Sequence, residues 1–201
     1  VADGFHSSRM RHGPIIEHST FEKMGDDGIA INGPYAMVIE ADQTTVIIAT
    51  QHENFFRPGD LLRAYDGRMA PIGEAGVVAV EENFGYQPSE TVRARQGSGP
   101  AQRDGFSGNR YHRLTLSRPL QLSYADFVAS PQATGSGYIL RNNTIRNHRA
   151  RGALLKADNG LIEGNTFSGS SMYGVLITPE TSWNEADYSH NVVIRGNTFT
   201  D

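Results

Sequence analysis

Three aspartates carry the clearest capacity for acid–base chemistry in this sequence. Asp26 and Asp27 are adjacent in the run Gly-Asp-Asp-Gly at 25–28, and Asp3 precedes another glycine near the start of the chain. Carboxylates held close together raise the pKa of one group and leave another ionised. An acid and a base of this kind are what hydrolysis of a glycosidic bond requires. Two alternatives stay open: aspartates that cap turns, and a Ca²⁺ site.

A repeated segment predicts how these residues are brought together. Its pattern is apolar, polar, any residue, Asn or Ser, Thr, apolar, and it occurs at 16–21, 140–145, 162–167 and 194–199. The alternation predicts a short strand, and Asn marks the bend that follows. The last three copies are 22 and 32 residues apart. A period in the low twenties with loop insertions is typical of a β-solenoid, and a β-sandwich is the alternative.

Glycines mark a second strand at a fixed distance from each repeat. Gly28, Gly152 and Gly174 each follow the last apolar residue of a repeat by seven positions and open an apolar run. Gly4 precedes Gly28 by 24 residues, which is one coil. Neighbouring coils lie about 4.8 Å apart. The residues before these glycines are therefore predicted to form a column: Asp3, Asp27, Arg151, Tyr173.

The fold class that follows is all-β, a right-handed parallel β-helix of the pectate-lyase-like solenoid type. We expect coils at 1–41 and 137–201, separated by an inserted antiparallel, β-barrel-like subdomain at 42–136. Its expected strands are 45–48, 61–65, 76–80 and 111–116, and the Gly- and Ser-rich stretch 97–109 is expected to be a mobile loop.

The ends and the composition set further expectations. Neither end has the cap that a solenoid needs, so we expect a fragment of a longer β-helix that docks against missing coils or forms a homo-oligomer. The net charge of −4 argues against a nucleic-acid partner. No apolar stretch reaches the roughly 20 residues of a membrane span, and no signal peptide is visible. Cysteine is absent, which excludes disulfides and thiolate chemistry.

Several other residues are candidates for binding substrate. His6 lies three positions after Asp3, and Trp183, the single tryptophan, lies in a polar loop where its ring could stack on a sugar or cover the edge of the core. If the carboxylates held a metal, a lyase base could come from Arg149, Arg151 or Lys156. The sequence contains no zinc motif of the HExxH type, no nucleophile elbow and no phosphate-binding glycine loop.

The motifs of these predicted coils resemble those of glycoside hydrolase family 110. The resemblance spans almost the whole chain and is carried by Asp-Gly-Phe-His at 3–6, by 25–33, by 147–152 and by the Trp183 loop before 192–197. Polygalacturonases of family 28 share the Asp-Asp spacing, but Ala2 stands where they have Thr, no Gly-His-Gly occurs, and 149–151 is Arg-Ala-Arg where they have Arg-x-Lys. A galactoside is therefore favoured over a uronic-acid substrate.

The resemblance implies an inverting α-galactosidase that removes terminal α-1,3-linked galactose from glycans, on a β-helix with an inserted barrel. It implies Asp26 as the general acid and Asp3 with Asp27 as the groups that hold and deprotonate water. His6, Arg149, Arg151 and Trp183 are the expected substrate-binding residues. We expect no metal and no other cofactor, and a secreted or periplasmic protein. The alternatives are a polygalacturonase-like hydrolase, a Ca²⁺-dependent lyase, and a non-catalytic carbohydrate-binding or structural β-helix.

Overall fold

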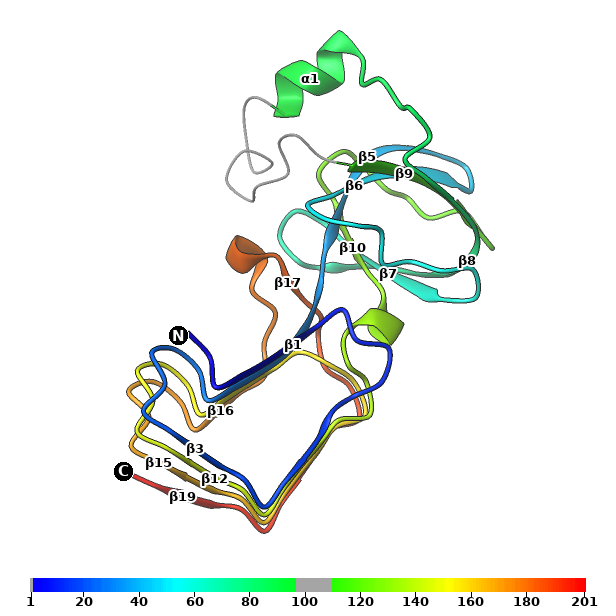
Figure 1. Ribbon diagram of the computed structural model, residues 1–201. Helices are drawn as coiled ribbons and strands as arrows, with labels where there is room; N and C mark the ends of the chain where they lie inside the picture. The colour runs from blue at the N-terminus through cyan, green and yellow to red at the C-terminus, as the bar shows by residue number, and fades with distance from the viewer. Residues whose placement is uncertain (1, 97–109) are drawn as a thin grey trace. The chain divides into compact units, whose positions relative to one another are not determined.

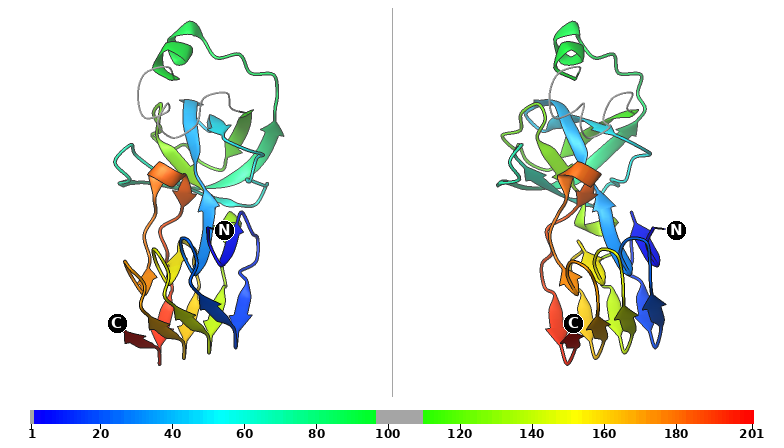
Figure 2. Two further views of the ribbon diagram at one scale, coloured as in Figure 1. Left: turned by 60° about the vertical axis from the view of Figure 1, so that its left-hand side comes forward. Right: turned by 90° about the vertical axis from the view of Figure 1, so that its left-hand side faces the viewer.

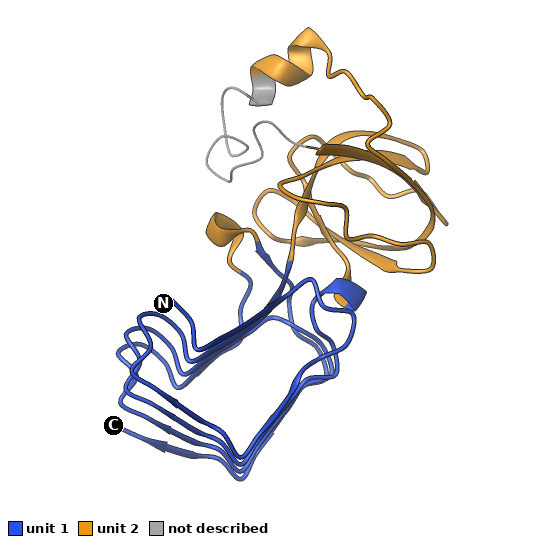
Figure 3. Cartoon of the chain, in the orientation of Figure 1, with its two compact units in different colours: residues 1–33, 132–179, 185–201 blue, residues 34–131, 180–184 orange. Residues whose placement is uncertain are grey.

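The structure is a computed structural model that describes residues 2–96 and 110–201 (Figure 1). The chain forms two compact units (Figure 3). The first, called the β-helix unit, comprises Val1–Gly33, Gln132–Pro179 and Glu185–Asp201, and the second, called the barrel unit, comprises Pro34–Pro131 and Glu180–Asn184. The loop expected at 97–109 lies outside the described residues.

Three sheets of short parallel strands build the β-helix unit, and Figure 2 shows their strands stacked coil upon coil. One sheet contains β1 (Phe5–Ser8), β4 (Ile29–Pro34), β13 (Ala153–Leu155) and β16 (Val175–Leu176), and β17 (Glu185–Ala186) also pairs with β4. The second contains β2 (Ile15–Glu17), β11 (Ile139–Arg141), β14 (Leu161–Glu163) and β18 (Val193–Arg195). The third contains β3 (Thr20–Glu22), β12 (Thr144–Arg146), β15 (Thr166–Ser168) and β19 (Thr198–Thr200). The predicted parallel β-helix is confirmed.

The repeats stack as the sequence pattern predicts. Leu140 pairs with Ile16 on one side and Ile162 on the other, and Ile145 lies between Phe21 and Phe167 in the same way. Apolar residues of the three sheets share one core, in which Ile29, Leu140 and Phe167 are almost fully buried. Because each coil presents its apolar residues inward at the same phase, stacking makes this core continuous.

The glycines are required by how closely the coils approach. Gly4, Gly28 and Gly152 donate their N–H groups to the carbonyl oxygens of Asp27, Arg151 and Tyr173. A Cβ atom on Gly28 would lie 2.6 Å from the carbonyl oxygen of Gly152, and one on Gly152 would lie 2.5 Å from that of Gly174. Both separations are shorter than any tolerated contact, so a side chain at these positions would force the coils apart. The predicted column of Asp3, Asp27, Arg151 and Tyr173 is confirmed.

Asparagine has a second role that the repeat pattern did not reveal. Asn143, Asn165 and Asn197 stack in a ladder: the Asn165 Nδ2 donates to the Leu140 carbonyl oxygen at 2.8 Å and to Asn197 Oδ1 at 2.9 Å. The backbone and side-chain N–H groups of Asn143 donate to Asn165 Oδ1. The ladder satisfies backbone groups at the bend that would otherwise be buried without a partner.

The barrel unit is a closed antiparallel barrel with the strand order β10-β5-β6-β9-β8-β7. Its strands are β5 (Ala36–Asp42), β6 (Thr45–Thr50), β7 (Leu61–Tyr65), β8 (Pro71–Glu82), β9 (Arg110–Leu116) and β10 (Phe127–Ala129). The four strands expected from the sequence correspond to β6, β7, β8 and β9. The inserted antiparallel β subdomain is thus present.

The barrel unit begins at Pro34, whereas the expected subdomain was 42–136. The expected range starts at the last residue of β5, because the coil pattern is continued through Asn32-Gly33-Pro34, although Asn-Gly and Gly-Pro are turn signals. The helical segments are α1 (Glu90–Gln96), η1 (Pro131–Ala133) and η2 (Thr181–Trp183). None of the helices in the described part of the chain has the length and apolar character needed to cross a membrane.

Candidate active site

The three predicted carboxylates meet at the N-terminal edge of the sheet that contains β1 and β4. The backbone N–H of Asp27 donates to Asp3 Oδ1 at 3.1 Å, and the backbone N–H of Asp26 donates to the Ala2 carbonyl oxygen at 3.0 Å. One oxygen from each of the three carboxyl groups lies within 4.8 Å of the others. Coil stacking therefore gathers these aspartates into one cluster, called the acidic cluster below.

The three side chains differ in their exposure. The side chain of Asp27 is 4% exposed, that of Asp3 is 14% exposed and that of Asp26 is 37% exposed. Burial raises the pKa of Asp3, and the negative charges of Asp27 and Asp26 raise it further, while the Asp27 N–H and His6 act in the opposite direction. Asp3 is thus the carboxylate in the cluster with the increased affinity for a proton.

Two arginines from the following coil contact Asp27 and Asp26. Arg151 donates from Nε to Asp27 Oδ1 at 2.8 Å and from its backbone N–H to the same oxygen at 2.9 Å. Arg149 lies with Nη2 3.3 Å from Asp26 Oδ1 and also donates from Nε to the Gly25 carbonyl oxygen. The Arg151 side chain is 12% exposed and that of Arg149 is 70% exposed. Arg151 is therefore a fixed part of the site, whereas Arg149 faces solvent.

His6 touches the cluster directly. Its Nδ1 lies 3.0 Å from Asp3 Oδ2, and its Nε2 lies 3.1 Å from Nδ2 of Asn32 on β4. The His6 side chain is 45% exposed. The structure thus brings together six of the predicted site residues: the three aspartates of the acidic cluster, His6, Arg149 and Arg151.

Trp183 belongs to the barrel unit. It ends the short helix η2, and it is 74% exposed. Its predicted contact with substrate stays a prediction.

Asn32 is the residue of this site that the sequence analysis missed. It is 2% exposed, and the strand register places it beside Ser8 on one side. The glycine phase could have identified it, because counting four residues from Gly28 and from Gly152 reaches two buried polar residues in one column, Asn32 and Lys156. A polar residue buried at such a position is there for a hydrogen bond.

A cation could be held by the acidic cluster, because three carboxylate oxygens at this spacing are ligands that Ca²⁺ accepts. Two of the three bases expected for a metal-assisted lyase, Lys156 and Arg151, fit less well. The Lys156 side chain is fully buried and pairs with Glu185, and Arg151 is held against Asp27. Neither is positioned to remove a proton from a polysaccharide.

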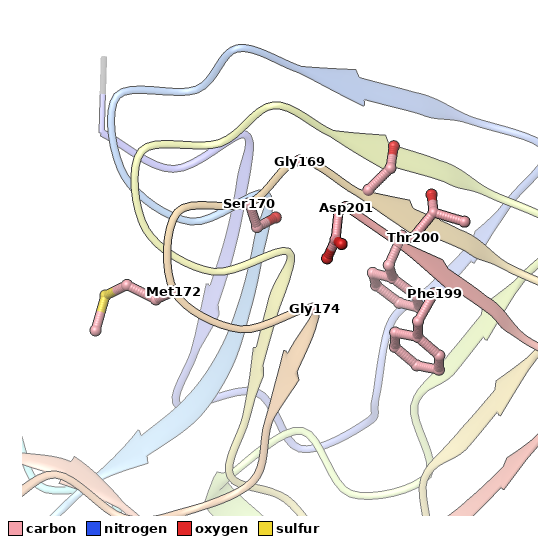
Figure 4. A pocket seen from close by; sticks show the side chains of 9 residues that line it. Gly169, Ser170, Met172, Gly174, Phe199, Thr200 and Asp201 are labelled. Carbon is pink, nitrogen blue, oxygen red and sulfur yellow. The ribbon is translucent and has the colours of Figure 1, made fainter.

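A hollow of about 430 Å³ lies elsewhere, at the coil that contains β19 (Figure 4). Its lining includes Phe167, Met172, Gly174, Phe199 and Asp201, and none of the predicted site residues. Phe199 stacks on Phe167 with ring centroids 5.1 Å apart and is still 53% exposed. The carboxylates of the acidic cluster do not line this hollow.

Comparisons with known proteins agree with this fold. The family described as "Right handed beta helix region" matches residues 129–201. The chain is 32% identical over 216 residues to alpha-1,3-galactosidase B of Akkermansia muciniphila, covering 98% of this chain and 23% of that protein. It is 28% identical over 210 residues to alpha-1,3-galactosidase B of Phocaeicola vulgatus, covering 98% of this chain and 32% of that protein. For alpha-1,3-galactosidase A of Bacteroides thetaiotaomicron, the identity is 28% over 195 residues, with 92% and 30% covered.

The chain therefore spans only 23% to 32% of the length of these relatives. Within that span the similarity includes both units, because nearly all of this chain is covered. The resemblance suggested by the coil motifs is confirmed: the chain is a right-handed parallel β-helix protein with an inserted antiparallel barrel, similar to the α-1,3-galactosidases of glycoside hydrolase family 110.

Proposed function

We propose that this chain carries the acid–base centre of a glycoside hydrolase that removes terminal α-linked galactose from glycans. The observation that supports it most directly is the acidic cluster, in which Asp3, Asp26 and Asp27 approach within 4.8 Å while differing in exposure. The curated relatives named alpha-1,3-galactosidases support the sugar and its linkage. The substrate is a glycan, so we also propose that the protein acts outside the cytoplasm.

Asp26 is the proposed general acid, because it is the most exposed of the three carboxyl groups and can reach the glycosidic oxygen of the leaving group. It donates its proton to the glycosidic oxygen as the bond from that oxygen to C1 of galactose breaks. Arg149 beside Asp26 is exposed and can turn toward the sugar. Positioned proton transfer of this kind contributes about 10²- to 10⁴-fold in rate.

Asp3 and Asp27 are proposed to hold the attacking water. The water oxygen bonds to C1, and its proton passes to Asp3, whose pKa is raised by burial so that it binds a proton more strongly than a free aspartate. Asp27 is fixed by Arg151 and holds the water in position. Free galactose and the shortened glycan are the products. His6, Arg149, Arg151 and Trp183 are proposed as substrate contacts.

We propose that the reaction inverts the anomeric centre, as the resemblance implies. The oxygens of the cluster are closer together than the roughly 6.5–9.5 Å between the carboxyl groups of many inverting enzymes, and nearer the about 5–5.5 Å of retaining ones. The proposal of inversion therefore rests on the resemblance and not on this spacing, and it requires Asp3 and Asp27 to hold the water on the face of the sugar opposite the leaving group. The stereochemistry of the product decides between the two mechanisms.

The test is a galactoside-release assay, run on this chain and on the full-length polypeptide, with an NMR time course of an α-galactoside. Inversion gives β-galactose first, and α-galactose as the first product would reject it.

Addition of a chelator leaves turnover unchanged if the mechanism needs no metal. Loss of activity with the chelator, together with an unsaturated product that absorbs in the ultraviolet, would support the lyase. Glycan binding without turnover, unaffected by replacing all three aspartates, would identify a non-catalytic β-helix.

A further inference from the structure

His6 bridges a carboxylate of the acidic cluster and a buried amide. Its Nδ1 lies 3.0 Å from Asp3 Oδ2, and its Nε2 lies 3.1 Å from Asn32 Nδ2. Both neighbours lie in the same part of the β-helix unit, because β1 and β4 pair in parallel with His6 opposite Ala30 and Ser8 opposite Asn32. Three residues therefore form one hydrogen-bonded chain: Asn32, His6, Asp3.

The chemistry of the three groups dictates which ring nitrogen carries the proton. An ionised Asp3 can only accept, so Nδ1 of His6 must donate to it. The Asn32 group that faces the ring is the amide nitrogen, which can only donate, so Nε2 of His6 must accept. A neutral imidazole with its proton on Nδ1 is the form that satisfies both contacts, and the hydrogen bond at one nitrogen selects the proton position at the other.

Asn32 is well placed to impose this form, because it is far more buried than the ring it holds. It is 2% exposed, whereas the His6 side chain is 45% exposed. Its backbone lies within β4, where its carbonyl oxygen accepts from the Arg9 N–H at 3.3 Å. Without the amide, the ring could rotate into solvent or place its proton on Nε2.

We propose that Asn32 is a positioning residue that fixes His6 as the Nδ1-protonated tautomer and, through it, holds the Asp3 carboxylate in one orientation. Asp3 Oδ1 already accepts from the backbone N–H of Asp27 at 3.1 Å. With Oδ2 held by His6, both oxygens have a fixed donor and the plane of the carboxylate is set. The catalytic consequence rests on the function proposed above, whereas the tautomer does not.

The tautomer is tested by ¹⁵N NMR of the chain at about pH 8, above the usual His pKa of roughly 6.5. Comparison with His6→Gln identifies the His6 signals among those of the seven histidines. We expect wild-type Nδ1 to carry the proton and Nε2 to resonate as an unprotonated nitrogen. In Asn32→Leu we expect a mixture of tautomers, and in Asn32→Asp we expect a proton on Nε2. Ser8→Ala, an exposed neighbour of Asn32 on β1, is the matched control and should leave the spectrum unchanged.

A proton on Nε2 in the wild type, or His6 signals that do not respond to Asn32→Leu, would overturn the proposal. A thermal melt of each variant separates loss of fold from loss of positioning. If Asn32→Leu unfolds, the spectra of the wild type and of Asn32→Asp still decide the question, because they compare a donor with an acceptor at residue 32.

The kinetic arm uses galactoside release by the full-length polypeptide. Misplacement of a reacting group by about 1 Å can cost about 100-fold in rate, so we expect Asn32→Leu to lower kcat by about 10- to 100-fold with little change in KM. Ser8→Ala should match the wild type. An Asn32→Leu enzyme with wild-type kcat would reject the positioning role. Absence of turnover in the wild type with the expected tautomer would reject the proposed function alone.

Discussion

The backbone N–H of Asp27 donates to Oδ1 of Asp3 at 3.1 Å, across two coils that are 24 residues apart in the sequence. One carboxylate residue thus orients the side chain of another through its main chain. The geometry of the acidic cluster consequently depends on how the coils stack, and a substitution that shifts β1 against β4 will disturb the chemistry without touching a carboxylate.

Replacing each aspartate of the cluster by Asn should remove most of the turnover. For Asp26→Asn we expect a fall in kcat of about 10²- to 10⁴-fold, because the variant cannot donate a proton. Asp3→Asn should fall by a similar factor because it cannot accept one. The measurement is galactose release, with Asp42→Asn, an exposed residue of the barrel unit, as the control.

Wild-type activity in Asp26→Asn would remove Asp26 from the role of acid. A substrate with an activated leaving group offers a sharper test, because such a substrate needs no protonation. Asp26→Asn should recover much of its rate on it, whereas Asp3→Asn should not. The opposite pattern would exchange the two roles.

Arg151→Met should destabilise the β-helix unit. It removes the side-chain partner of Asp27, whose side chain is 4% exposed, and breaking a buried ion pair in this way costs about 3–5 kcal/mol. Denaturant unfolding measures the change. The double variant with Asp27→Asn should recover part of the loss, because the uncompensated buried charge is gone. If the two single changes simply add, the pair is not coupled and this account of Arg151 is wrong.

The stability of the chain should depend on the ionisation of Asp3. Burial raises the pKa of Asp3 above its unfolded value of about 3.9, so folding favours the protonated form. Its favourable contribution is complete below the unfolded pKa and is lost as the pH rises through the folded pKa. Asp3→Asn cannot ionise, so its melting temperature relative to the wild type should rise as the pH increases from about 3 toward neutrality. A difference that stays constant with pH would contradict the raised pKa.

The asparagine ladder should contribute to stability according to burial. Asn165 is 1% exposed, and Asn165→Leu removes one donor to the Leu140 carbonyl oxygen and the acceptor of the Asn143 backbone N–H. An unsatisfied buried group costs about 1–3 kcal/mol. Asn197→Leu makes the same chemical change at a half-buried position, where water can replace the lost contacts, and should cost less. Equal losses in the unfolding free energy would mean that burial does not set the cost.

The architecture could be predicted because each coil repeats the same physical demand. Gly28 and Gly152 allow a close approach between coils, and apolar residues such as Ile145 and Phe167 fill one core, so both signals recur at a constant phase. The column that contains Asp3 and Asp27 followed from that phase alone. The same phase also predicted that Arg151 lies beside Asp27, but it did not predict the geometry of their ion pair.

The rest depends on features without a period. At the start of the barrel unit, Asn32-Gly33-Pro34 has the composition of a turn, but β4 extends to Pro34 and β5 begins at Ala36. The glycine phase leads to Asn32 but does not encode its contact with His6. The differing exposure of Asp26 and Asp27 arises from packing around each side chain, which no local pattern encodes.

The chain enters the barrel through β5 and leaves it through β10, and these two strands are hydrogen-bonded to each other. Ala36 on β5 pairs with Val128 on β10, and Met37 pairs with Phe127. The two ends of the insertion are therefore about one strand spacing apart, near 4.8 Å. An insertion whose ends meet leaves the host backbone almost where an ordinary turn would leave it. The segment Pro34–Pro131 therefore separates Asp27 from Arg151 by 124 positions in the sequence without separating the neighbouring coils that carry them.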